Sequence, residues 1–330
     1  MSGSTGSPPE PTGPVHDVEP TAADATSDAT SGAHSDQTSD QTAGDPAGEH
    51  SPQLPAEPKS RAGRNLPAAV AVGVLLVATA LASLYFVRWL FIVLAVVAIF
   101  LGTAELATAM RARGIVLARF PLLFGAVALP VLGYWGGPAQ VLMGFGLVFL
   151  FTLVWRLFRR GTEDFVRDAT ASSFVLSYAP LMGGFAALIA AAPDGADLVV
   201  TFLALSVASD IGGYATGVLF GKHPMARSIS PKKSWEGFAG SVGLQVILGA
   251  ALFATILESD WWKGAIVGAV MAGTATLGDF IESAIKRDLG IKDMSNLLPG
   301  HGGVMDRLDS IIPNTVVAYT LFALTLGGIG

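Results

Sequence analysis

The segment 279–309 carries most of the chemistry that this sequence offers. It reads DFIESAIKRDLGIKDMSNLLPGHGGVMDRLD and holds ten of the 33 charged side chains found in residues 65–330. Apolar runs flank it on both sides, and each is long enough to cross a bilayer. Charged groups at the edge of a membrane are costly unless they pair, bind a metal ion or meet a charged ligand. Acids and bases that alternate beside a glycine-rich loop indicate a site for metal-bound phosphate groups.

Four polar side chains near the start of this segment recur at helical spacing, at positions i, i+3, i+4 and i+7. They are Asp279, Glu282, Ser283 and Lys286. One face of a helix would present them together. The structural alternative is an ion-paired stripe that seals a helix bundle, with Lys286 satisfying Asp279. Two acids and a hydroxyl are more than such a seal needs, so we favour a catalytic face.

The glycine-rich loop 299–303 (PGHGG) is the second element. The backbone N–H groups of Gly302 and Gly303 can approach an anion closely, because glycine has no side chain in the way. The loop runs directly into residues 304–309, and a helix that begins there would favour a phosphate at its N-terminus. His301 is either a substrate contact or a hydrogen-bonded loop residue.

Two acids, Asp306 and Asp309, follow this loop three residues apart, so they can face the same way on a helix. Together with Asp279 they form three carboxylates able to converge on a hard cation such as Mg²⁺. The sequence therefore predicts a metal site made of these three side chains. The absence of cysteine excludes disulfides and thiolate metal ligands.

The segment 230–237 (SPKKSWEG) joins two further apolar runs. Ser230 before Pro231 predicts a helix N-cap followed by proline in the first turn. Lys232 and Lys233 would then lie near the start of that helix, where the helix dipole prefers acids. Either the positive-inside rule or an anionic ligand explains them, and this segment alone leaves both explanations open.

A lone acid lies inside the apolar run 197–221. It is Asp210, and Tyr214 follows it one helical turn later among several glycines. A buried acid in a membrane span is by default a functional candidate. The alternative interpretation of the glycines is structural, because small residues let membrane helices pack closely.

The apolar pattern predicts an all-α fold, a polytopic membrane helix bundle of about nine transmembrane helices. About 20 apolar residues are needed to cross the hydrocarbon core of a bilayer. The expected spans are 66–87, 89–110, 115–134, 138–157, 171–192, 197–221, 236–257, 263–286 and 311–330. No internal repeat is visible, which weakens interpretations as a transporter built from duplicated halves.

Residues 1–64 have a different composition from the rest of the chain. They are rich in Ser, Thr, Gly, Pro, Ala and Asp and carry ten acids and three bases. Such a segment cannot bury enough apolar surface to offset the entropy lost on ordering, so we expect a disordered, acidic tail. It lacks the basic and then apolar regions of a signal peptide.

The basic residues indicate an orientation in the membrane. Of the 20 Lys and Arg residues, 18 fall in the tail or in the connections after the second, fourth, sixth and eighth spans. Cytoplasmic connections carry such an excess of positive charge. The N-terminus and the charged segment 279–309 are therefore expected on the cytoplasmic side.

Residues 283–309 resemble the signature of the CDP-diglyceride synthases, also called phosphatidate cytidylyltransferases. The family pattern is S-x-apolar-K-R, four residues, K-D, a small residue, an apolar-Pro/Gly pair and H-G-G-apolar-x-D-R-apolar-D, and every specified position is met. The segment D-x-x-x-Y-x-x-G that begins at Asp210 and the segment 230–237 are similar to the family's upstream motifs. Ser234 stands where many members have threonine, a change that keeps the hydroxyl.

The resemblance is strong over about residues 200–330, is only a general apolar character over 65–200, and does not include the tail. Together with the composition, it divides the chain into three regions: the disordered cytoplasmic tail 1–64, N-terminal transmembrane helices 65–200, and a catalytic transmembrane region 201–330. The resemblance also implies a reaction. The implied reaction converts CTP and phosphatidate into CDP-diacylglycerol and pyrophosphate with Mg²⁺, and a second cation is left open. A homodimer among the lipids of the plasma or inner membrane is implied as well, and no nucleic-acid partner is expected.

The resemblance also implies roles for individual residues. The implied catalytic set is Asp279, Ser283, Lys286, Asp306 and Asp309. Of these, Asp279 and Asp306 would bind the metal, and Asp309 would be a third ligand or a hydrogen-bond partner of Ser283. The residues that would hold the phosphate groups or line the nucleotide pocket are Lys232, Lys233, Lys286, Arg287, Lys292, His301, Gly302, Gly303 and Arg307. Secondary candidates are Asp210, Tyr214, Glu282 and Asp293.

Two other functions are weighed against this one. A CTP-dependent polyprenol or phytol kinase would have a similar membrane domain, but the complete signature argues against it. An ion-coupled transporter would use Asp210 and Asp279 as ion sites at the middle of the membrane. The charges cluster instead at the expected cytoplasmic ends of the spans, which argues against transport.

Overall fold

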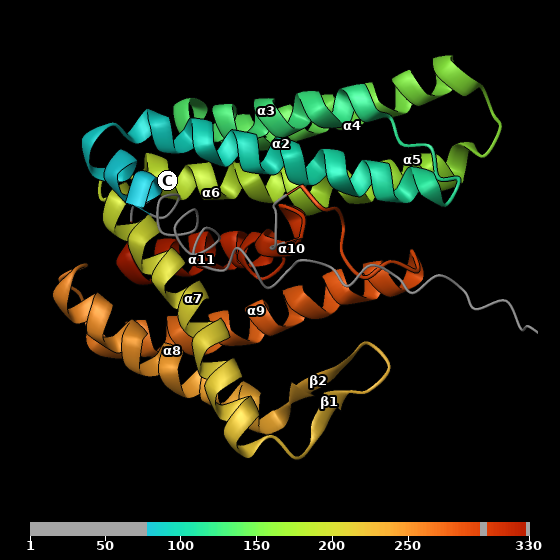
Figure 1. Ribbon diagram of the computed structural model, residues 1–330. Coiled ribbons are helices and arrows are strands. Elements are labelled where there is room, and N and C mark those ends of the chain that lie inside the picture. The colour runs from blue at the N-terminus through green and yellow to red at the C-terminus, as the bar shows by residue number, and fades with distance from the viewer. Residues whose placement is uncertain (1–77, 298–301, 328–330) are drawn as a thin grey trace, which may run out of the picture. The chain divides into compact units, whose positions relative to one another are not determined.

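The protein is described here through a computed structural model, and the structure describes residues 78–297 and 302–327 (Figure 1). Residues 78–86 are helical, and the helices that follow are α2 (Arg88–Ala112), α3 (Arg119–Gly136), α4 (Pro138–Arg160), α5 (Phe165–Leu176), the π-helical turn η1 (Ser177–Leu181), α6 (Met182–Ala191), α7 (Gly195–Phe220), α8 (Trp235–Thr255), α9 (Trp261–Asp288), α10 (Met305–Leu308) and α11 (Ile311–Leu326). Between α7 and α8, the short strands β1 (Pro224–Ala226) and β2 (Ser230–Ser234) pair antiparallel.

The all-α membrane fold predicted from the apolar pattern is confirmed. Within 78–297 and 302–327, eight helical segments are long and apolar enough to cross a membrane. One of them, Phe165–Ala191, combines α5, η1 and α6. Pro180 lies in its π-helical turn, where a wider backbone helix accommodates a residue that has no N–H to donate. The first expected span, 66–87, lies mostly outside the described residues.

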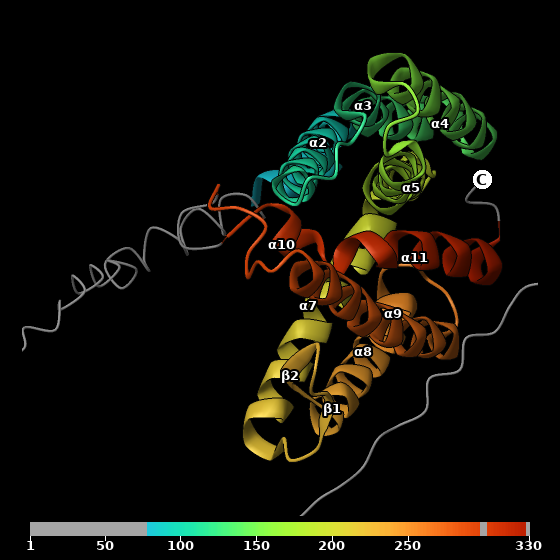
Figure 2. The same ribbon diagram turned by 90° about the vertical axis from the view of Figure 1, so that its right-hand side faces the viewer.

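The described helices form two groups that α11 joins. Helices α2 to α6 pack beside one another, and α7 runs from this group at a steep angle toward α8, α9 and the β-hairpin (Figures 1 and 2). Helix α11 contacts both α6 and α9. The C-terminal ends of α2, α4 and α9 and the hairpin all point toward the right of Figure 1. Because the arginines and lysines between spans gather there, we call this side the basic end.

Glycines allow α8 and α9 to cross with their backbones in contact. A β-carbon added to Gly264 would lie 2.1 Å from the carbonyl oxygen of Gly249, and one added to Gly268 would lie 2.2 Å from that of Gln245. No side chain fits at such positions. Small residues at crossings are the usual device by which membrane helices pack closely. This crossing fixes α9, and with it the charged side chains near its end.

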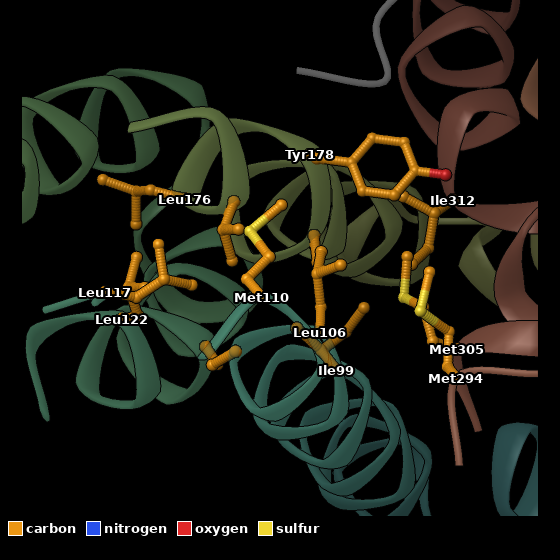
Figure 3. Packing of buried hydrophobic residues seen from close by; sticks show 14 of the residues in the cluster. Ile99, Leu106, Met110, Leu117, Leu122, Leu176, Tyr178, Met294, Met305 and Ile312 are labelled. Carbon is orange, nitrogen blue, oxygen red and sulfur yellow. The ribbon is translucent and has the colours of Figure 1, made fainter. Parts of the chain in front are cut away.

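A buried apolar cluster ties the segment that follows α9 to helix α2. Met294 and Met305 pack in the same cluster as Leu106 and Ile99 of α2, and Tyr178 and Ile312 belong to it too (Figure 3). Close packing of such side chains is one of the forces that hold membrane helices together. The C-terminal signature segment therefore packs against helices of the N-terminal half of the membrane domain.

The predicted helix start at Ser230 and Pro231 is wrong. Residues 230–234 form strand β2, and α8 begins at Trp235. Ser234 is the N-cap, and its hydroxyl accepts a hydrogen bond from the N–H of Gly237 at 3.1 Å. Ser234, four residues after Ser230, can cap the helix in the same way. Because Ser234 is the N-cap, residues 230–234 precede the helix and can pair with β1. Proline is tolerated in such an edge strand.

The helix crossing leads to a prediction about stability. The substitution Gly264→Ala should lower the free energy of unfolding by about 1–3 kcal/mol, because its methyl group would overlap the backbone of α8. The matched control is Gly273→Ala on the same helix, where an added β-carbon meets no described atom within 4 Å. Thermal unfolding of the purified protein in detergent checks this. Equal melting temperatures for the two variants would contradict the close crossing.

Candidate active site

A lysine near the end of α9 is the centre of a buried charge network. The ammonium group of Lys286 lies 2.5 Å from a carboxylate oxygen of Glu282 and 3.0 Å from one of Asp306. Glu282 is fully buried and the side chain of Lys286 is 17% exposed. An unpaired charge in this position would be very costly, so the three groups hold one another in place. The structural alternative, in which Lys286 satisfies Asp279, is wrong, because Lys286 pairs with Glu282 and Asp279 pairs with Lys233.

Asp306 links two parts of the signature segment through hydrogen bonds. Its carboxylate accepts hydrogen bonds from the N–H groups of Met294 at 2.9 Å and Gly303 at 2.8 Å, in addition to Lys286. Gly302 has φ +78°, a left-handed conformation that favours glycine. The N–H of Gly303, which we expected to face an anionic ligand, donates to this internal carboxylate. Asp306 is thus the anion around which the described part of the loop is arranged.

Glu105 of α2 is a site residue that the sequence analysis missed. One of its carboxylate oxygens accepts hydrogen bonds from the hydroxyl of Ser295 at 2.6 Å and the N–H of Val304 at 3.0 Å, and the other accepts from the N–H of Met305 at 2.9 Å. The side chain is buried. A signal was present, because Glu105 is an acid inside the apolar run 89–110, and such acids are functional candidates by default.

A second charged pair lies between the hairpin and α9. The ammonium group of Lys233 on β2 pairs with the carboxylate of Asp279 and lies 5.0 Å from the centre of the Phe280 ring. A cavity of about 200 Å³ opens beside this pair. It is enclosed by α7, the hairpin, α8 and α9, and its polar lining includes Asp210, Tyr214, Lys232, Lys233, Ser234 and Asp279. Three motifs that are distant in the sequence therefore meet at one cavity.

Asp309 lies between the two charged pairs. It is close enough to both Asp279 and Glu282 for their negative charges to repel. One of its oxygens accepts the N–H of Ser310 at 2.7 Å. Gly278 permits this approach, since a β-carbon there would lie 2.5 Å from the carbonyl oxygen of Asp309. Acidic side chains thus gather where α9 meets the signature segment.

The acidic side chains have the chemistry that a divalent cation needs, although they are not arranged as a finished metal site. Among the described residues, no three histidine or acidic side chains come together closely enough to hold an ion. Beyond the pair with Lys286, neither carboxylate oxygen of the buried Glu282 has a hydrogen-bond partner among the described residues. Carboxylate oxygens that gather in one place and repel one another fit a hard cation such as Mg²⁺.

The remaining predicted residues surround this centre. Ser283 is half-buried on α9. Four charged residues are exposed at the same end of the molecule: Arg287, Lys292, Asp293 and Arg307. His301 lies outside the described residues. The exposed bases could therefore contact a ligand from the solvent side, and Lys233 and Lys286 could contact it from inside the bundle.

Comparison with known proteins places the chain in a family. Residues 67–325 match the Cytidylyltransferase family. The chain belongs to this family. Phosphatidate cytidylyltransferase from Mycobacterium leprae is 42% identical over 285 residues, which cover 80% of this chain and 89% of that protein. The enzyme of the same name from Mycobacterium bovis is 40% identical over 286 residues, or 82% of this chain and 93% of that protein.

A more distant relative covers a shorter part of the chain. Phosphatidate cytidylyltransferase from Synechocystis is 40% identical over 133 residues, which are 39% of this chain and 45% of that protein. The cytidylyltransferase match, in contrast, runs from 67 to 325. It therefore includes Glu105, the hairpin and the signature in a single family region.

Glu105 gives the second prediction. Glu105→Gln keeps the size of the side chain but replaces one acceptor oxygen with a donor, so at least one of its three hydrogen bonds must be lost. Hydrogen bonds to a charged group contribute about 1.5–3 kcal/mol. Local opening of residues 302–309 should therefore become about tenfold or more frequent, as measured by hydrogen–deuterium exchange of peptides from that segment. The control is Thr108→Ala, an exposed position one turn along α2. Unchanged exchange in Glu105→Gln would contradict an anchoring role.

Proposed function

We propose that this protein catalyses the reaction of CTP with phosphatidate to give CDP-diacylglycerol and pyrophosphate. The observation that carries the proposal is the meeting of α9 with the signature loop and the hairpin at the basic end of the membrane helices, where Lys286 pairs with Asp306 and Lys233 pairs with Asp279. The names of the mycobacterial relatives, which align over most of their own length, support the same reaction.

The reaction needs little covalent chemistry from the protein. A phosphate oxygen of phosphatidate attacks the α-phosphorus of CTP and forms a new P–O bond, while the bond from that phosphorus to the oxygen bridging to the β-phosphate breaks. The electron pair leaves with pyrophosphate. Because both reactants are anions, the catalyst must neutralise charge and align the groups in line. Positively charged donors in a partly buried site are suited to this task.

We assign the metal to the acids and the phosphates to the bases. Asp279, Asp306 and Asp309 would hold Mg²⁺, which would supply positive charge to the phosphate oxygens, and the number of ions is open. Lys233 and Lys286 each pair with one of these acids. If these acids held a cation instead, the ammonium group of Lys233 and part of that of Lys286, which would keep its pair with Glu282, would become available to phosphate. Lys232 and Arg307 would bind the substrates from the outside.

We place the site on the cytoplasmic side of the cell membrane, with the acidic tail on the same side, because the basic end is where the positive-inside rule puts the cytoplasm. CTP then reaches the site from water, and phosphatidate keeps its acyl chains in the leaflet. Exposed apolar side chains on α7, beside the cavity, provide a lipid-facing surface for those chains. They include Val207, Ile211, Tyr214 and Val218. We expect the enzyme to act as a homodimer.

The test uses the purified full-length protein with CTP labelled at the α-phosphate, phosphatidate and Mg²⁺. We expect the label in CDP-diacylglycerol, with release of pyrophosphate and loss of the activity on addition of EDTA. Labelled CDP in solution with a phosphorylated polyprenol or phytol would indicate the kinase alternative. Ion flux in proteoliposomes without consumption of CTP would indicate a transporter, and either result would contradict the proposal.

Asp306 gives the third prediction. Asp306→Asn should lower turnover by about 10²-fold or more, because the substitution removes a charge that binds metal and pairs with Lys286. The control is Asp260→Asn, which removes an exposed carboxylate that pairs with Lys263 at the start of α9. Turnover per folded protein, with folding checked by size-exclusion chromatography, measures the effect. Near-normal turnover of Asp306→Asn would show that the metal assignment is wrong.

A further inference from the structure

A second basic region lies apart from the candidate active site. A groove of about 550 Å³ is formed between the α2–α3 connection and the C-terminal end of α4. Its lining includes five arginines and no acid: Arg111, Arg119, Arg156, Arg159 and Arg160. It shares no lining residue with the cavity beside Asp279. We call this region the arginine groove.

The floor of the groove is rigid. Arg156 is 2% exposed, and its guanidinium group binds the buried carboxylate of Asp168 at 3.0 Å and the carbonyl oxygen of Glu163. Asp168 also accepts the N–H of Val116 from the α2–α3 connection at 3.2 Å. These bonds hold the connection against the ends of α4 and α5. The groove is therefore preformed and does not depend on flexible surface side chains alone.

Donors in the groove lack partners. The Nη1 atom of Arg156 is buried and has no hydrogen-bond partner among the described residues. A buried donor without a partner costs about 1–3 kcal/mol or more when it is charged. The side chains of the exposed residues Arg111, Arg119 and Arg160 take part in no hydrogen bond or ion pair among the described residues, whereas Arg159 lies over the Trp155 ring at 5.0 Å. An anion bound here would relieve the repulsion between the arginines and would lie over the positive charge of Arg156, which lines the groove.

The apolar wall of the groove indicates which kind of anion it takes. Phe120 stacks on Trp155 with ring centres 5.1 Å apart, and Leu123 continues the lining along α3. Phe120 and Phe124 are more than half exposed on this membrane-spanning helix, and they lead from the groove along its length. A small soluble anion has no apolar part that could pack against this wall. A ligand with a phosphate at one end and acyl chains at the other matches both parts.

We propose that the arginine groove binds the phosphate headgroup of an anionic phospholipid from the surrounding leaflet, at a site separate from the catalytic one. Arginine suits this task because its planar group can donate two parallel hydrogen bonds to a phosphate. The inference does not depend on the proposed reaction. It concerns the lipid that the enzyme holds and not the lipid that it converts.

The test measures lipid binding directly. The purified full-length protein is titrated with dioleoyl phosphatidylglycerol or dioleoyl phosphatidylcholine in detergent, and bound lipids are counted by native mass spectrometry. We expect wild type to retain phosphatidylglycerol in preference to phosphatidylcholine. The double variant Arg119→Gln/Arg160→Gln should bind phosphatidylglycerol about tenfold more weakly, since both side chains are exposed and their loss should leave the fold intact.

The matched control is Lys222→Gln/Arg227→Gln, which removes two exposed charges near the hairpin at the same end. It should bind phosphatidylglycerol within about twofold of wild type. Equal weakening of phosphatidylglycerol binding in both double variants would mean that the groove adds only general positive charge. If wild type showed no preference for phosphatidylglycerol over phosphatidylcholine, the groove would not be a site for anionic lipid. Displacement of the lipid by millimolar inorganic phosphate would assign the groove to a soluble anion. Each of these three results would overturn the proposal.

Discussion

The structure depends on the neutralisation of charges that lie inside or at the edge of an apolar bundle. Glu282 is fully buried, and the ammonium group of Lys286, 2.5 Å away, is the positive charge that pairs with it in the described structure. Lys286 also reaches Asp306, which belongs to a different segment of the chain. A buried charge that loses its partner costs about 3–5 kcal/mol. The end of α9 and the signature loop are therefore held in one arrangement.

The same constraint explains why the two halves of the membrane domain need each other. The signature segment is held in place by contacts with α2. Met294 and Met305 pack into a cluster that contains Leu106, and the buried Glu105 accepts three hydrogen bonds from the segment. Helix α2 thus supplies both apolar contact and charge. Helix α2 carries no signature residue, yet through these contacts it is part of the candidate site.

Much of the fold and of the site could be predicted from the sequence, because membrane spans and the signature leave strong local patterns. The apolar runs indicated the helices, and the spacing of Asp279, Glu282 and Lys286 indicated one shared helix face. The pairing within that face could not be predicted, because it depends on tertiary contacts: Lys233 from the hairpin reaches Asp279, and Lys286 binds Glu282 and Asp306.

Two features could not be found by local patterns. The hairpin was mistaken for a helix start because Ser230 and Ser234 can both act as caps, and only strand pairing with β1 decides between them. Glu105 was passed over because its hydrogen-bond partners lie about 190 residues or more along the chain.

A double-mutant cycle on thermodynamic stability tests the central charge network most directly. Lys286→Gln alone should lower the free energy of unfolding by about 3–5 kcal/mol, because it leaves the carboxylate of Glu282 buried without a partner. Adding Glu282→Gln should restore a large part of that loss, since the carboxylate that lost its partner is then replaced by a neutral amide, while Asp306 keeps the hydrogen bonds from Met294 and Gly303. The cycle is completed by Glu282→Gln alone. If the losses in unfolding free energy of the two single variants simply add in the double variant, Glu282 and Lys286 do not depend on each other. That result would contradict the account of the site as one charge-neutralised unit.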